Sequence, residues 1–284
     1  MPCSAAVTVR RFPLWLAAVL VAAAVTRADD TRRPCEMRVE SELFADGGTK
    51  PVARALTVFH DGVAWDFLEE PTGDDKAMKV CEIALHDPAR ERVLVIDPVR
   101  HLKTQVEMIR LERLSVSLAK WARSSDDRLV RWAGGPDFTA GFTEEDDRLE
   151  LVGPRVRYAV AYDEAPAGDA AETYRRFADT AILLKALLHP GGIPPFPRLA
   201  LNRRLEEAGA IPSEVTLEID SRLTALGARP EKLRCVHRVH PRILQGDLKR
   251  IEDARAHIAT SDAIDLQAFV GRADTAARTD PPGS

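Results

Sequence analysis

The segment from residue 36 to residue 107 alternates apolar and polar residues, and this alternation most constrains how the chain can fold. It begins in residues 37–43, with a period of two that is typical of a strand with one buried face. Asp61-Gly62 predicts a hairpin, because both turn positions favour positive φ. Asp-Pro pairs at 87–88 and 97–98 each favour the start of a tight turn. We therefore predict an antiparallel meander of about six strands.

The pattern then changes to a longer period. In residues 108–121 and 170–188, apolar residues recur at steps of three and four, which predicts two amphipathic helices. Shorter helices are expected at 198–208 and 247–259, a loop or linker at 124–136, and further strands at 148–152, 156–162, 214–219 and 232–240. The predicted fold class is α+β: a curved antiparallel β-sheet, built as a meander with a half-barrel as an alternative, and several helices packed on one face.

The first 28 residues have the features of a secretory signal peptide. Arg10-Arg11 precede an apolar run at 12–25, and Ala28 ends a small-residue cleavage pattern. The run is shorter than the roughly 20 residues that a spanning helix needs. We predict a signal peptide at 1–28, a single α+β domain at 29–270 and a disordered tail at 271–284. The mature protein is expected to be periplasmic or secreted, without a transmembrane segment, by either the Sec or the twin-arginine route.

The charge of the chain bears on nucleic-acid binding, and its cysteines bear on disulfide formation. Three of the 40 basic residues lie in the signal segment and none of the 44 acidic ones does, so the mature part is acidic. Nucleic acid is therefore not an expected partner. The three mature cysteines, Cys35, Cys81 and Cys235, allow one disulfide in an oxidising compartment or remain buried free thiols. The sequence does not choose between these alternatives.

No catalytic residue, metal ligand or cofactor is predicted. Cys235, His237 and His240 resemble a zinc set, but in a strand His237 and His240 point to opposite faces, so ordinary strand residues are the favoured interpretation. Sequence motifs of hydrolytic nucleophiles are absent. A hydrolase whose site is assembled only by the fold remains an alternative, with His60, His86 or His101 beside an acid.

Two apolar stretches suggest a ligand. Residues 93–96 are apolar on both sides of their predicted strand, so both faces must be covered, by helices or by a lipid-like ligand. Val63, Trp65 and Phe67 present an apolar face on a neighbouring strand. Core packing and a hydrophobic pocket both explain this pattern. The pocket hypothesis assigns ligand binding to these residues: Val63, Trp65, Phe67, Val93 and Val95.

Residues 36–107 also resemble a known family. The strand order, with Ala84-Leu85-His86-Asp87 and the Val93–Pro98 stretch, is similar to the curved sheet of periplasmic lipoprotein carriers and related outer-membrane lipoprotein-sorting proteins. This resemblance implies acyl chains held in the concave face of an unclosed barrel that helices cover. Through residues 95–98, 174–179, 194–199 and 201–202, the mature chain is similar to exported planctomycete-type bacterial proteins, a resemblance that implies no assigned activity.

The favoured functional hypothesis is an exported, non-enzymatic protein that binds an apolar ligand, such as a lipid or a lipoprotein acyl chain. Two alternatives stay open. One is the periplasmic hydrolase described above. The other is a cell-envelope scaffold that docks a partner through Pro194-Pro195-Phe196-Pro197, since such a segment is stiff and extended.

Overall fold

The structure is a computed structural model that describes residues 34–72, 77–135, 137–166, 168–220 and 232–270. The predicted signal peptide at 1–28 and the predicted tail at 271–284 lie outside the described residues. Their assignments therefore stay predictions.

The predicted meander is confirmed. Its six strands follow one another in the chain: β1 (Met37–Ala45), β2 (Ala53–His60), β3 (Val63–Thr72), β4 (Ala77–Asp87), β5 (Arg92–Asp97) and β6 (Leu102–Glu107). Each strand pairs antiparallel with the next. Asp61 and Gly62 join β2 to β3 with φ of 53° and 73°, so both turn residues are left-handed, as the Asp-Gly pair predicts.

A second antiparallel run lies beside the first. It contains β7 (Phe142–Glu145), β8 (Arg148–Gly153), β9 (Val156–Glu164), β10 (Ala210–Ile219) and β11 (Lys232–His240). β11 pairs with β10, as predicted, and also with β1 in an antiparallel register from Arg38↔His240 to Ala45↔Leu233. Together with β12 (Asp262–Ala263), which pairs parallel with β6, the described strands form one open sheet in the order β12-β6-β5-β4-β3-β2-β1-β11-β10-β9-β8-β7.

The helices of the described residues are α1 (Met108–Arg123), α2 (Arg128–Ala133), α3 (Ala170–Leu188), α4 (Phe196–Glu207) and α5 (Gln245–Thr260). α3 has the predicted bounds. The prediction of a loop at 124–136 is wrong where α2 forms. The Asp127 carboxylate caps α2 by accepting hydrogen bonds from the Leu129 and Val130 amides. A helix of six residues is too short to show a period in the sequence.

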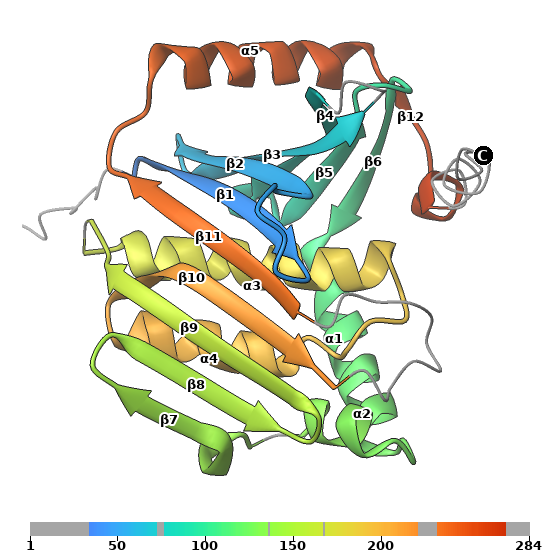
Figure 1. Cartoon of the computed structure of the whole chain (residues 1–284). Coiled ribbons are helices and arrows are strands. Elements are labelled where there is room, and N and C mark those ends of the chain that lie inside the picture. Colours follow the sequence, from blue (N-terminus) through green and yellow to red (C-terminus); the bar gives the residue numbers. More distant parts are fainter. Residues whose placement is uncertain (1–33, 73–76, 136, 167, 221–231, 271–284) are drawn as a thin grey trace, which may run out of the picture. The chain divides into compact units, whose positions relative to one another are not determined.

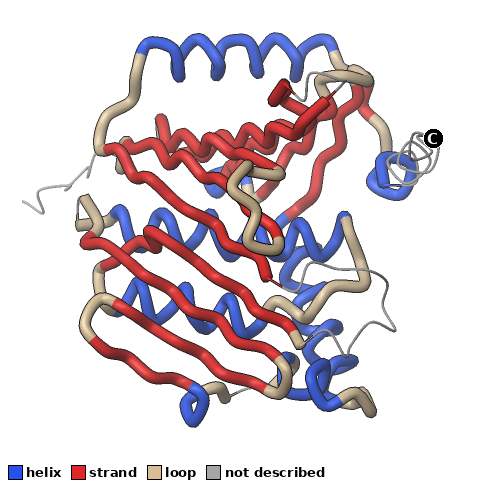
Figure 2. Tube along the Cα trace, in the orientation of Figure 1, coloured by secondary structure: helices blue, strands red, loops and turns tan. Residues whose placement is uncertain are grey.

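Helices α1, α3 and α4 pack on the same face of the sheet. The first half of α3 places Tyr174 and Ala178 against Met37 of β1, and its last turns place Leu184 and Leu188 against β4–β6. One helix reaches strands this far apart in the sheet because the sheet curls around it (Figure 1 and Figure 2). α4 covers β8 and β9 in the same way. The predicted fold class, a curved antiparallel sheet with helices on one face, is confirmed.

Helix α5 adds a layer on the opposite face. Ile251 and Ala254 pack there against Trp65 and Phe67 of β3 and against Ile96 of β5. On the other face of β5, Val93 and Val95 pack against α1 and α3. The apolar stretch 93–96 is thus covered on both sides, as predicted, and helices supply both covers. Helix α5 is an addition to the predicted architecture of several helices on one face.

Ile251 is a buried side chain through which α5 packs on the outer face of β3–β5, so Ile251→Ala should destabilise the fold. We expect the free energy of unfolding to fall by about 2–5 kcal/mol, since a buried isoleucine leaves a cavity. Glu252→Ala, at an exposed position of the same helix, is the control and should stay within about 0.5 kcal/mol of the wild type. Urea unfolding measures both, and equal effects would contradict the packing role of α5.

Candidate functional site

The five residues of the pocket hypothesis do not line one cavity. Trp65 and Phe67 are 3% and 2% exposed beneath α5, whereas Val93 and Val95 are fully buried on the other side of the sheet. Packing alone accounts for the burial of these four side chains, although Phe67 also borders a small cavity of about 340 Å³ beside α5. Val63 lines a larger cavity, described next. The ligand-binding role of these five residues stays a prediction.

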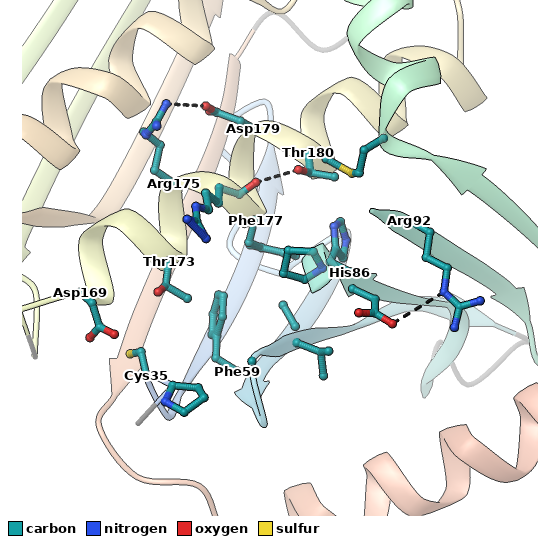
Figure 3. A pocket seen from close by; sticks show the side chains of 18 of the residues that line it. Cys35, Phe59, His86, Arg92, Asp169, Thr173, Arg175, Phe177, Asp179 and Thr180 are labelled. Carbon is teal, nitrogen blue, oxygen red and sulfur yellow. Dashed lines mark hydrogen bonds and ion pairs between the residues drawn. The ribbon is translucent and has the colours of Figure 1, made fainter. Parts of the chain in front are cut away.

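A first cavity, here called the His86 cavity, has a volume of about 490 Å³ (Figure 3). It lies between the β2–β3 turn, the end of β4 and the first half of α3. Its apolar lining includes Phe59, Val63, Ala64, Met108, Phe177 and Leu183. The Phe177 ring meets the His86 ring edge to face, with centroids 4.8 Å apart.

His86 is the buried polar group of this cavity. It is 5% exposed, and neither ring nitrogen has a hydrogen-bond partner among the described residues. Burial, assisted by the positive charge of Lys185, lowers the pKa of His86 to about 3, so the imidazole is neutral at physiological pH. No described serine, threonine or carboxylate bonds to it, so the structure does not equip His86 as a catalytic base.

Several charged groups around the His86 cavity are held in ion pairs. The Asp87 carboxylate lies 2.8 Å from Arg90 and 3.7 Å from Arg92. Arg175 lies 3.3 Å from Asp179 and 2.6 Å from Glu206. The lining thus combines apolar side chains and a neutral imidazole with charged groups, of which Asp169 has no ion pair among the described residues.

A second and larger cavity, here called the α1–α3 cavity, has a volume of about 740 Å³. It lies on the curled inner face of the sheet, between α1, the second half of α3 and strands from both runs. Its apolar lining comprises Leu43, Leu114, Leu118, Trp121, Ile182, Ala186, Val215, Leu217, Ile219 and Leu233. Pro194 and Pro195 also line it. The cavity is thus lined mainly by aliphatic side chains and is partly open to solvent.

The cationic side chains that line the α1–α3 cavity differ in their partners. Lys185 is paired, since its Nζ lies 2.6 Å from a carboxylate oxygen of Glu82. The Arg198 side chain forms no hydrogen bond or ion pair with any described residue, and its Nη1 is shut off from water. Burial raises the pKa of Tyr158 to about 12 and that of Cys235 to about 11, and the charge of Arg198 opposes both shifts.

The fold brings one Ser–His pair together that the sequence did not suggest. Ser41 Oγ lies 2.8 Å from Nδ1 of His237, across the β1–β11 pairing and 196 residues apart in the chain. No carboxylate bonds to His237 within the described residues, so the pair lacks the acid of a hydrolytic triad. His60 contacts Glu36 at 3.0 Å and Asp61 at 3.3 Å near the protein surface, without a serine or threonine bonded to it. Neither histidine is therefore part of a complete hydrolytic site among the described residues.

Three other sequence expectations have structural outcomes. Pro194, Pro195 and Pro197 are buried, and Phe196 packs against the core over β8 and β9, so this segment is not the exposed docking element of the scaffold hypothesis. Cys35, Cys81 and Cys235 are free thiols. His237 bonds Ser41, whereas His240 faces Glu40 at 3.5 Å, as expected for strand residues on opposite faces.

Comparison with protein-family models and with curated proteins gives no match. Among solved structures, the chain is similar to a LolA superfamily protein from Nitrosomonas europaea. The identity is 8%, the match covers 75% of this chain and 88% of that chain, and the TM-score is 0.25. At this TM-score, the function has to be inferred from the cavities. Among the described residues, no helix is both long and apolar enough to cross a membrane.

The buried imidazole predicts a pH-dependent stability. Folded His86 stays neutral down to a pKa of about 3, whereas the unfolded chain takes up its proton near 6.5, so acidification from pH 6.5 towards 3 favours unfolding. Between pH 7 and pH 5, His86→Leu should lose about 2 kcal/mol less unfolding free energy than the wild type.

Urea titrations at both pH values measure this difference. His101→Asn, at an exposed position, controls for the loss of any imidazole. If His86→Leu loses as much stability as the wild type over this interval, the described burial of His86 is wrong.

Proposed function

We propose that this chain is an exported, non-enzymatic protein that binds an apolar ligand, such as a lipid or a lipoprotein acyl chain, in the α1–α3 cavity. The observation that carries the proposal is the cavity of about 740 Å³ with an aliphatic lining on the inner face of the sheet. Its volume is in the range of pockets that hold small molecules, about 300–1,000 Å³.

Removal of apolar surface from water favours an occupant for such a space. The cavity is partly open, so its apolar lining is exposed to water, and an apolar ligand would cover it. Leu118, Leu217 and Leu233 border the cavity from α1, β10 and β11. An acyl chain gains about 0.8 kcal/mol for each buried methylene, so about ten methylenes gain about 8 kcal/mol before the cost of immobilisation.

The elements that line the cavity are held in place by packing outside it. α3 is fixed by Tyr174 and Leu184 in two separate parts of the core. Pro194 and Pro195 stiffen the segment that leads into α4. A preformed apolar site pays less ordering entropy on binding, which supports a carrier or binding role. Export is part of the proposal and rests on residues 1–28 alone.

The binding test uses residues of the α1–α3 cavity, because Trp65 and Val95 are core residues whose loss would disturb the fold. Delipidated protein should bind the uncharged dye N-phenylnaphthylamine saturably, with increased fluorescence. Ala186→Phe, which fills the cavity from α3, should weaken binding about tenfold or more. Val116→Phe, exposed on α1 and outside the cavity, should leave the affinity unchanged.

Circular dichroism confirms that both variants are folded. Absence of saturable dye binding by the wild type would refute the proposed function. Equal affinities of Ala186→Phe and the wild type would place the ligand elsewhere.

A further inference from the structure

Of the two cationic side chains that line the α1–α3 cavity, Lys185 and Arg198, the one without a partner among the described residues is Arg198. It lies in the first turn of α4, directly after the buried Pro194–Pro197 segment, and it lines the cavity. Its guanidinium makes no hydrogen bond or ion pair with any described residue, and Nη1 has no access to water. Arg198 is half-buried, and a charged donor that is shut off from water without an acceptor is unfavourable unless an anion is brought to it.

The neighbouring side chains do not neutralise this charge. Asp179 is close enough for Arg198 to favour its ionised form, but its carboxylate oxygens are bound by Asn202 at 2.7 Å and by Arg175 at 3.3 Å. Lys185, also at the cavity, is already held by Glu82. An anion that enters the cavity would therefore meet Arg198 as the unpaired cation.

A second donor lies near Arg198. Tyr158 lines the cavity from β9, is nearly fully buried, and its hydroxyl bonds to no described residue. The phenol remains protonated at physiological pH, because burial raises its pKa to about 12. A guanidinium offers forked donors that match a carboxylate or a phosphate, and a phenol adds one more.

We propose that the ligand of the α1–α3 cavity is an amphipathic anion, an acyl chain with a carboxylate or phosphate head, and that Arg198 binds this head. The inference rests on the proposed function and adds the chemical class of its ligand. Leu114, Leu118 and the strand residues Leu217 and Leu233 then hold the chain. Arginine suits this role better than lysine, since its planar fork binds such heads through two hydrogen bonds.

The test compares ligands that share one chain and differ in the head. Dodecanoate, dodecyl phosphate, dodecanol and dodecyltrimethylammonium each displace N-phenylnaphthylamine from delipidated protein, below their micellar concentrations. Wild-type protein should bind at least one of the two anions about tenfold more tightly than the alcohol, and the cation most weakly. The two anions distinguish a carboxylate-binding site from a phosphate-binding site.

Arg198→Met should remove the preference for the anions while retaining the dye and the alcohol, which also shows that the variant is folded. Arg198→Lys should keep part of the preference, because it keeps a point charge. Arg203→Met, at an exposed position of the same helix and outside the cavity lining, is the matched control and should keep the full preference.

The outcomes separate the two proposals. If wild-type protein binds dye and alcohol but shows no preference for either anion, or if Arg198→Met keeps the preference, the role of Arg198 is wrong and the cavity remains an apolar site. If wild-type protein binds neither dye nor alcohol nor anion, the proposed function fails, and this inference with it.

Discussion

The pairing of β1 with β11 is the interaction on which the rest of the structure depends. It joins residues 38–45 to residues 233–240 and turns two antiparallel runs into one sheet. The α1–α3 cavity takes Leu43 from β1 and Leu233 from β11, so its wall exists only because these strands are neighbours. The Ser41–His237 contact spans the same seam. Without this pairing there would be two smaller sheets and no shared inner face.

Helices α3 and α5 cover the two opposite faces of this sheet. α3 runs along the inner face and packs at both of its ends, while α5 seals the outer face over β3–β5. The two larger cavities described above lie along different parts of α3: residues from Thr173 to Leu183 line the His86 cavity, and Ile182, Lys185 and Ala186 line the α1–α3 cavity. A helix that is fixed at two places but does not fill the space beside it leaves room for a ligand without unfolding the core.

Local patterns predicted most of the fold. Asp61-Gly62 specified its hairpin through backbone sterics, and the Tyr174–Leu188 stripe specified α3 through its period. The β1–β11 pairing was not predictable, because alternation shows which face of a strand is buried and not which distant strand lies beside it. The same limit explains why the residues of the α1–α3 cavity were not predicted. Trp65 and Val95 are conspicuous in the sequence because they are core residues, whereas nothing local distinguishes Arg198 from the many solvated arginines.

The central claim is that an acyl ligand occupies the inner face of the sheet, between α1, α3 and β9–β11. A crystal structure with dodecanoate carrying bromine at the end of its chain tests this directly, because anomalous scattering locates the bromine. The account predicts a bromine peak in the α1–α3 cavity, among side chains such as Leu118 and Leu217, with the carboxylate at Arg198. A peak beneath α5 near Trp65 and Phe67, or no peak at saturating ligand, would contradict it.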